Sequence, residues 1–154
     1  MPIPAAPPGQ KNPDPHCREF VRSPASEDDG KVRARGWDLV GRPSESGPIR
    51  VIVGTSDYDG MCRPRQYQEF VFVRGIFAGT LSPVPMDSRT DGALGRVTIP
   101  NEGRVQAEYS RYGAADPLCC PSRITKVVFE IGNEPPVLTP VSASTVPTSP
   151  PTRQ

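Results

Sequence analysis

Apolar residues along the middle of this chain follow the patterns of β-strands. Residues 49–54 (IRVIVG) form a short continuous apolar run, which is typical of a strand covered on both faces. Residues 67–82 hold two such runs around Arg74-Gly75, a pair that suits a tight hairpin turn. In the first of these runs phenylalanine and valine alternate, so both faces are apolar and we expect a central strand.

The second half of the chain predicts strands with one face in water. Residues 96–112 alternate apolar and polar positions on both sides of an Asn-Glu-Gly turn, which is the pattern of a hairpin. Residues 124–131 (ITKVVFEI) predict a further strand, and residues 135–141 an edge strand. Helical periodicity is limited to residues 16–28, where Pro24 would end a helix after two turns.

These patterns predict an all-β, mainly antiparallel fold of six or seven strands, either a small sandwich or a partly open barrel. At most one short N-terminal helix is expected. Proline, with 21 of 154 residues, gathers at the two ends of the chain. We therefore predict disordered proline-rich tails at residues 1–15 and 142–154, flanking a single β-rich domain at residues 16–141.

Charge and hydropathy exclude several classes of partner. The net charge is +1, so no strong field favours nucleic acid or an anionic membrane, and we expect no nucleic-acid partner. No apolar stretch is long enough to span a membrane. The start of the chain lacks the pattern of a secretion signal, which is expected either of a cytosolic protein or of a form whose signal sequence has been removed.

The sequence carries no motif for catalysis or for a cofactor. The only histidine, His16, lies at the edge of the proline-rich tail, so we expect no enzyme and no cofactor. Four acids in two glycine-containing loops suggest calcium, namely Asp57, Asp59, Asp87 and Asp91. Their spacing does not match a calcium-loop register, and Asp-Gly is also common in turns. We expect turns and no metal site, with a calcium-dependent module as an alternative.

A long polar connection between strands is the most favoured binding region. The possible binding loop comprises Ser82, Pro83, Met86, Asp87, Ser88, Arg89 and Asp91. Within it, Arg89 is expected to neutralise its acidic neighbours. Trp37 is either a binding platform or a packing residue, and packing is the more favoured interpretation.

The four cysteines are Cys17, Cys62, Cys119 and Cys120. Their spacing provides neither two chelating pairs for zinc nor a C-x-x-C redox motif. Adjacent Cα atoms lie about 3.8 Å apart, closer than ordinary disulfides require, so a bond between Cys119 and Cys120 is disfavoured. Pro121 favours an extended backbone at Cys120, which would point the two adjacent side chains apart. We expect bonds from this pair to Cys17 and Cys62, in either pairing, and an oxidising compartment.

Two stretches and the strand after them resemble the LppP/LprE-like lipoprotein family of bacterial cell-envelope proteins. The stretches are residues 70–97 and 105–123, and the resemblance covers about residues 66–140. Its most specific mark is a tyrosine-ended strand followed by DPLCCPS, here Tyr112 and residues 116–122. The resemblance implies an exported, non-catalytic envelope protein and carries no catalytic residues. No lipobox precedes Cys17, which we do not assign as an acylation site.

Together these observations predict a periplasmic, envelope or secreted β domain that acts by binding or by a structural role. The alternatives are an accessory subunit held in an envelope assembly through its proline-rich arms, and the calcium-dependent module. The expected class of partner is another envelope protein.

Overall fold

The computed structural model describes residues 1–9 and 14–148. Its elements in chain order are a 3-10 helix at Pro15–Phe20, helix α1 at Glu27–Arg33, and strands β1 (Asp38–Leu39), β2 (Ser44–Ser46), β3 (Ile49–Tyr58), β4 (Pro64–Val73), β5 (Ile76–Thr80), β6 (Leu94–Asn101), β7 (Arg104–Arg111), β8 (Arg123–Gly132) and β9 (Val137–Pro147).

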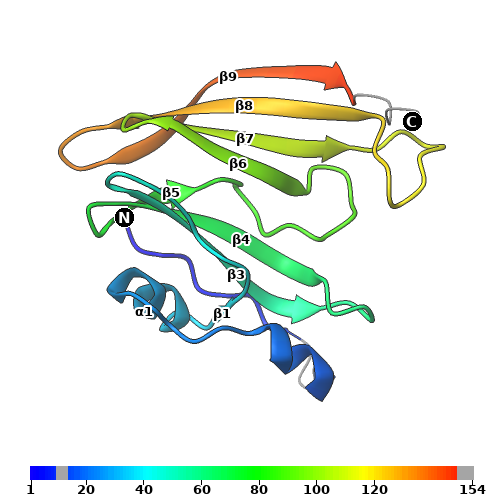
Figure 1. Cartoon of the computed structure of the whole chain (residues 1–154), viewed down its shortest axis with the longest axis horizontal. Coiled ribbons are helices and arrows are strands. Elements are labelled where there is room, and N and C mark those ends of the chain that lie inside the picture. The colour runs from blue at the N-terminus through cyan, green and yellow to red at the C-terminus, as the bar shows by residue number, and fades with distance from the viewer. Residues whose placement is uncertain (10–13, 149–154) are drawn as a thin grey trace.

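The strands form two antiparallel sheets that lie as two layers (Figure 1). Sheet 1 has the order β1-β3-β4-β5, and β2 also pairs with β3; sheet 2 has the order β6-β7-β8-β9. Within the described part of the chain neither sheet closes into a barrel. The predicted mainly antiparallel β fold is confirmed, as is the short helix. Strands β1 and β2, with two and three residues, are too short to produce an alternation in the sequence.

The predicted hairpins are present. Strands β4 and β5 are joined by Arg74-Gly75, and both residues have positive φ, as a tight hairpin turn requires. Strand β4 is the central strand expected from its alternation, because it pairs with β3 on one side and β5 on the other. Strands β6 and β7 form the second hairpin, and β8 pairs with both β7 and the edge strand β9.

The main core lies between the two sheets. Alternate residues of β3 and β4, such as Val51 and Val71, point toward sheet 2 and meet Val105 and Phe129. A second cluster covers the opposite face of sheet 1, where Trp37 packs on Phe70. The buried members of this second cluster are Val32, Trp37, Leu39, Ile52, Phe70 and Phe72. Sheet 1 is therefore the middle layer, covered on both faces.

Helix α1 covers the outer face of sheet 1, but it begins later than the sequence suggested. The side chain of Ser26 caps it by accepting the N–H of Asp29 at 3.1 Å, and Pro24 lies outside the helix. Residues 16–28 are therefore not one helix: their first part is the 3-10 helix. The N-cap serine and the acids that follow it favour a helix start at this point, because they satisfy free N–H groups and the helix dipole.

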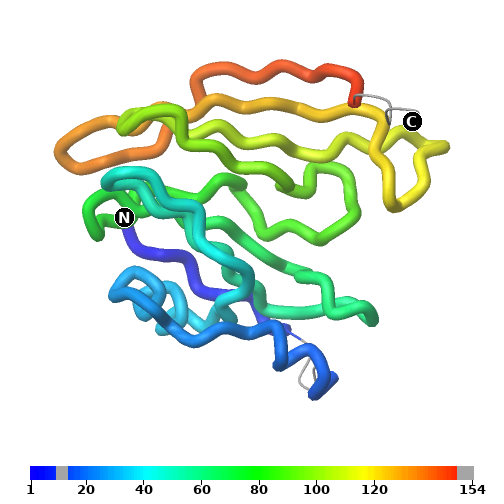
Figure 2. Tube along the Cα trace, in the orientation of Figure 1, coloured from blue at the N-terminus to red at the C-terminus, as the bar shows by residue number. Residues whose placement is uncertain are grey.

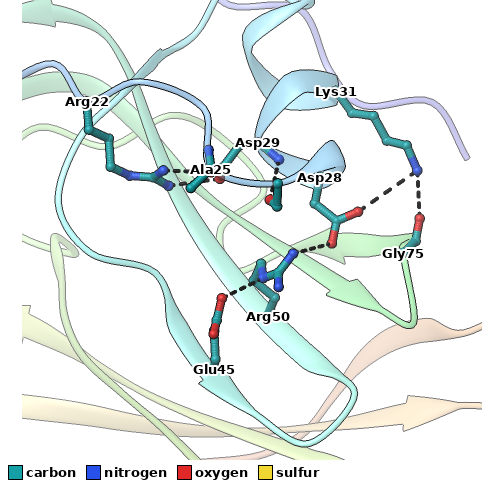
Figure 3. Close-up of polar contacts among 9 residues, drawn as sticks. Arg22, Ala25, Asp28, Asp29, Lys31, Glu45, Arg50 and Gly75 are labelled. Carbon is teal, nitrogen blue, oxygen red and sulfur yellow. Dashed lines mark hydrogen bonds and ion pairs between the residues drawn. The ribbon is translucent and has the colours of Figure 1, made fainter.

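Two carboxylates bind this helix to its surroundings (Figure 3). Asp29 accepts two hydrogen bonds from the guanidinium of Arg22, at 2.7 and 2.9 Å, and one from the N–H of Ala25 at 2.8 Å. Asp28 pairs with Arg50 of β3 at 3.2 Å. The hydrogen bond from Arg22 holds the pKa of Asp29 below its usual range despite burial. These acids are thus buried and paired.

The N-terminal residues pack against sheet 1 instead of forming a tail. Figure 2 shows them on the side of sheet 1 that faces away from sheet 2. The indole N–H of Trp37 donates to the carbonyl of Pro4 at 2.9 Å, and Ile3 and Ala6 contact the apolar cluster around Trp37. Trp37 is therefore a packing residue. The part of the predicted N-terminal tail at residues 10–13 lies outside the described residues.

The predicted C-terminal boundary also differs from the structure. Strand β9 runs to Pro147, and its register with β8 extends from Val137 to that residue. Residues 142–147 are therefore part of sheet 2 and not a tail, while residues 149–154 lie outside the described residues. Strand β9 is held by backbone hydrogen bonds to β8, and most of its side chains are exposed. Because these side chains are mostly small or polar, the sequence of residues 142–147 shows no apolar pattern that would predict a strand. No helix in the described part of the chain has the length and apolar character needed to cross a membrane.

Candidate functional site

An open groove of about 530 Å³ lies between the edges of the two sheets. Its floor is the inner face of sheet 2, and its wall is the end of β5 with the segment that follows. The lining residues are Thr80, Leu81, Ser82, Pro83, Gly92, Tyr109, Arg111, Thr125, Val127, Phe129, Leu138 and Pro140. We call this feature the inter-sheet groove.

The groove results from a mismatch in strand length. Strand β5 has five residues, whereas β8 and β9 opposite it have ten and eleven, so β5 leaves part of their inner face without a strand above it. One end is closed where the sheets meet: a Cβ on Gly79 would lie 3.1 Å from the Cβ of Leu138. Gly79 has a φ of +146°, a conformation that other residues rarely adopt.

The groove has an apolar floor and one charged residue on its rim. Val127 and Phe129 form the floor on β8, while Arg111 reaches the rim from β7. Its Nε–H donates to Asp91 at 3.0 Å. A guanidinium has five N–H donors, so one hydrogen bond to Asp91 leaves further donors for a ligand. The arrangement suits a molecule with an apolar body and an anionic end.

Two tyrosine hydroxyls fasten the chain beside the groove. Tyr109 donates to the carbonyl of Leu81 across the gap between the sheets, and Tyr67 donates to the carbonyl of Leu94 at 2.9 Å. Burial, with a contribution from nearby Glu69, raises the pKa of both tyrosines, so both stay neutral donors. The segment after β5 is thereby held as a fixed wall.

Glu69 is a buried acid in the central strand β4. It is 6% exposed, and it shares with Tyr67 and Val71 the face of β4 that points toward sheet 2. Its backbone carbonyl accepts the N–H of Leu81 at 3.0 Å, which places the residue directly behind the groove wall. Burial raises the pKa of Glu69 to about 8, so its carboxyl is protonated at neutral pH.

Only the first residues of the predicted binding loop reach the groove. Ser82 and Pro83 line it. Met86 is buried in the core and exchanges two backbone hydrogen bonds with Tyr67, both at 2.8 Å. Arg89 is exposed with a φ of +60°.

The acids of this loop bind the domain's own backbone and side chains. Asp87 accepts the N–H of Gln66 at 2.8 Å, and the hydroxyl of Ser88 donates to the carbonyl of Pro64 at 2.7 Å. Asp91 pairs with Arg111, while no ion pair of Arg89 is found among the described residues. The charge of Asp91 is therefore neutralised by Arg111 and not, as the sequence predicted, by Arg89. The contacts of Asp87 and Ser88 fix the loop to sheet 1, and the contact of Asp91 fixes it to sheet 2.

The four aspartates considered for calcium do not converge. In residues 1–9 and 14–148 no group of three or more metal-binding side chains is present. Asp59 accepts the Nε–H of Arg63 at 2.6 Å and two backbone N–H groups of its own turn. Asp87 and Asp91 are occupied by the contacts given above.

All four cysteines are in disulfides, but their connections differ from the expectation. Cys17 bonds to Cys62, and Cys119 bonds to Cys120. The expected bonds between the adjacent pair and the two remote cysteines are wrong. The chain turns just before Pro121: the N–H of Cys120 donates to the carbonyl of Pro117 at 3.0 Å, so Leu118 and Cys119 lie in a turn. A turn brings neighbouring side chains together, whereas an extended segment separates them.

The two disulfides lie in opposite environments. Cys17 lies in the 3-10 helix, is 1% exposed and packs with Val40 and Tyr58. The adjacent pair lies in the exposed connection between β7 and β8, which we call the tip loop (residues 112–122). Closing the 45-residue separation between Cys17 and Cys62 stabilises the fold by about 4 kcal/mol in the chain-entropy model. The bond between adjacent residues closes no comparable loop.

Sequence reasoning missed the inter-sheet groove and Glu69. The groove depends on how far β5 extends relative to β9, and pattern analysis locates strand ends poorly. Glu69 did leave a signal, because it is a carboxylate directly before residues 70–73, a run that is apolar on both faces. Such a position requires either a partner or a raised pKa.

The comparisons with known proteins give one match. A family model described as LppP/LprE lipoprotein matches residues 45–134, which is more than half of the chain. The matched range includes Glu69, most of the groove lining and the tip loop. A search of curated proteins and a search of solved structures found no match.

Proposed function

The chain belongs to the LppP/LprE lipoprotein family, and from this premise we propose that it is an extracytoplasmic envelope protein that binds an amphipathic lipid. The lipid's acyl chain occupies the inter-sheet groove, and the domain acts by binding without catalysis. The proposed location is supported by the Cys17–Cys62 disulfide, because disulfides persist in oxidising compartments such as the periplasm.

The observation that carries this proposal is the apolar groove itself. Its volume of about 530 Å³ lies in the range of small-molecule sites, which are mostly apolar with a few placed polar groups. Val127 and Leu138 are partly exposed and supply open apolar surface, and the buried side chains of Leu81 and Phe129 lie at its base. An acyl chain is the occupant that gains most from such a surface, since burial of each methylene contributes about 0.8 kcal/mol.

Arg111 supports an anionic head group. It lies on the rim beside Thr125, and Asp91 orients its side chain through the Nε–H. The remaining guanidinium N–H groups suit a carboxylate or phosphate, which accept two parallel hydrogen bonds from arginine. We therefore expect fatty acids and anionic phospholipids to bind more tightly than neutral lipids with the same chain.

Titration of the whole chain with a fluorescent long-chain fatty acid tests the proposal. Val127→Trp fills the groove floor and is expected to weaken binding at least about tenfold, a loss of about 1.4 kcal/mol. Val128→Trp is the matched control, because Val128 is the next residue of β8 and faces the opposite side of sheet 2. If the unaltered chain shows no saturable binding, or if both variants bind equally, the proposal is wrong.

The role of Arg111 has a separate test. Arg111→Ala is expected to weaken binding of the fatty acid while leaving binding of the corresponding fatty alcohol unchanged. Arg104→Ala is the control on the same strand, since Arg104 pairs with Glu130 away from the groove. Equal effects of Arg111→Ala on the acid and the alcohol would contradict the assigned head-group contact.

The earlier alternatives have less support. An accessory subunit held by free arms requires the two ends of the chain to be available, yet residues 3–6 contact sheet 1 and residues 142–147 pair with β8. A calcium-dependent module requires converging acids, and Asp59, Asp87 and Asp91 each accept hydrogen bonds from protein groups. An envelope-protein partner remains a proposal.

A further inference from the structure

The tip loop presents a disulfide between two adjacent residues at the surface. Cys119 and Cys120 are both exposed, and their Cα atoms lie 3.7 Å apart because one peptide bond joins them. Leu118 beside them is 65% exposed. The pair therefore lies where a second molecule can reach both sulfur atoms.

This bond is not what holds the tip loop in place. The Asp116 carboxylate accepts the N–H groups of Gly113 and Ser122, at 2.6 and 2.9 Å, and so ties together the two ends of the loop. The hydroxyl of Tyr112 donates to the carbonyl of Leu118 at 2.8 Å. These contacts involve no sulfur atom, so the loop keeps its anchors when the disulfide opens.

The bond also contributes little to the stability of the fold. A disulfide stabilises mainly by shortening the free chain in the unfolded state, and the effect grows with the length of the closed loop. Cys17–Cys62 closes a separation of 45 residues, whereas Cys119–Cys120 closes a separation of 1. A bond that neither anchors its loop nor restricts the unfolded chain has no structural reason to remain closed.

We infer that Cys119–Cys120 is a reversible redox site that exchanges with a dithiol partner, while Cys17–Cys62 stays oxidised. Exposed disulfides are the ones that thiols reduce readily, since the attacking thiolate must approach a sulfur atom directly. Cys17 is 1% exposed and Cys62 is partly buried, so an attacking thiolate reaches this bond less readily than the exposed pair. The two bonds of one chain thus differ in chemical role.

The exchange is balanced by a partner with two thiols. A partner thiolate attacks one Sγ, forming an intermolecular disulfide and releasing the other Sγ as a thiolate, which takes up a proton. The partner's second thiol then attacks the mixed disulfide and displaces the remaining cysteine. The partner leaves with one disulfide, and Cys119 and Cys120 have gained two electrons and two protons as free thiols.

Timed reduction of the oxidised full chain tests this inference. The chain is treated with dithiothreitol under native conditions, quenched with an alkylating reagent and analysed by peptide mass spectrometry. Alkylation at Cys119 and Cys120 is expected at least about tenfold faster than at Cys17 and Cys62. Appearance of all four thiols at one rate would overturn the inference.

Stability and reversibility give the second measurement. The selectively reduced chain and the variant Cys119→Ser/Cys120→Ser are expected to keep the Tm of the oxidised chain, whereas Cys17→Ser/Cys62→Ser lowers it. Oxidised glutathione is expected to close the reduced pair again. A fall in Tm on opening Cys119–Cys120, or failure of the pair to close, would show that the bond is structural or irreversibly lost.

Discussion

Sheet 1 and sheet 2 are both antiparallel, yet they differ in how much of their surface the chain covers. In sheet 1 the seven residues from Tyr67 to Val73 of β4 are all buried, because helix α1 and the N-terminal residues lie on one face and sheet 2 on the other. In sheet 2 the outer face is polar and open, and most of β9 is exposed. We therefore expect the middle layer to carry most of the stability, and the outer layer to present the surfaces proposed for binding.

The same difference extends to charges and cysteines. The acids beside sheet 1 are buried and paired, as Asp29 is with Arg22, whereas the ion pair of Arg104 and Glu130 on sheet 2 is about half exposed. The disulfide Cys17–Cys62 packs beside sheet 1 with Cys17 buried and Cys62 partly buried, whereas the adjacent pair lies in the exposed tip loop of sheet 2. The floor of the inter-sheet groove, Arg111 on its rim and the exposed disulfide all belong to sheet 2, the less covered sheet.

Removal of Trp37 should produce the largest loss of stability. Its indole is 1% exposed, packs edge-on to Phe70 at 5.1 Å and donates to Pro4, so Trp37→Ala leaves a cavity and releases the N-terminal residues. We expect a loss of about 4 kcal/mol in the free energy of unfolding, measured by urea denaturation.

The matched variant on sheet 2 is Val128→Ala, on the open face of β8. We expect a loss below about 1 kcal/mol, because a half-exposed valine gives up little buried area. If the two variants lose similar free energy, the assignment of stability to sheet 1 is incorrect.

The strands were predictable because local pattern determines them. The alternation of phenylalanine and valine in β4 indicates a strand that is apolar on both faces, and only a middle layer accommodates such a strand. Arg74-Gly75 identified the β4–β5 turn through the conformational freedom of glycine. The family resemblance was likewise carried by a short local string, DPLCCPS.

Most of the errors concern contacts between segments distant in the sequence. Residues 1–9 look like a tail until Trp37 provides a surface for Ile3, and residues 142–147 look like a tail until β8 provides a backbone to pair with. The predicted cysteine pairing was wrong for a local reason instead, because a turn that begins at Pro117 brings two adjacent sulfur atoms together. The inter-sheet groove depends on the relative ends of β5 and β9, which neither strand encodes alone.

Loss of the Asp29 charge is the next largest expected effect. Asp29→Asn leaves Arg22 without its carboxylate, and removing one member of a buried pair costs about 3 kcal/mol. The pKa of Asp29 is lowered in the fold, so its stabilising effect is present above the usual value of 3.8 and is lost as pH falls further. Denaturation from pH 7 down to pH 2 should therefore show the two proteins converging in acid.

Asp91→Asn is the control in the sheet 2 region, because Asp91 pairs with Arg111 at the surface. Exposed pairs contribute below about 1 kcal/mol, so this variant should unfold almost as the unaltered chain does at neutral pH. A large loss of unfolding free energy for Asp91→Asn, or no loss for Asp29→Asn, would contradict the expectation that ion pairs stabilise sheet 1 more than sheet 2.

Of the three sheet 1 variants, Glu69→Gln should give the smallest effect, and its sign should be opposite to the other two. It belongs to sheet 1 but faces sheet 2, and burial raises its pKa to about 8 from a usual value of 4.5. The fold therefore disfavours ionisation of Glu69, and its stability falls as pH rises from about 4.5 and levels off above about 8. Glu69→Gln removes this charge and should stabilise the protein at pH 9 by about 2 kcal/mol, since burial of the amide offsets part of the gain.

Thermal unfolding between pH 4 and pH 9 tests this expectation, with Glu108→Gln as the partner variant. Glu108 lies on β7 and faces the open side of sheet 2, where its ion pair with Arg96 is solvated, so its replacement should leave the shape of the pH profile unchanged. The gain in stability from Glu69→Gln should disappear near pH 4, because the Glu69 carboxyl of the unaltered chain is then mostly neutral in the folded and in the unfolded state. A constant advantage at every pH would assign the effect to packing, and none at pH 9 would show that solvent reaches the carboxylate behind the inter-sheet groove.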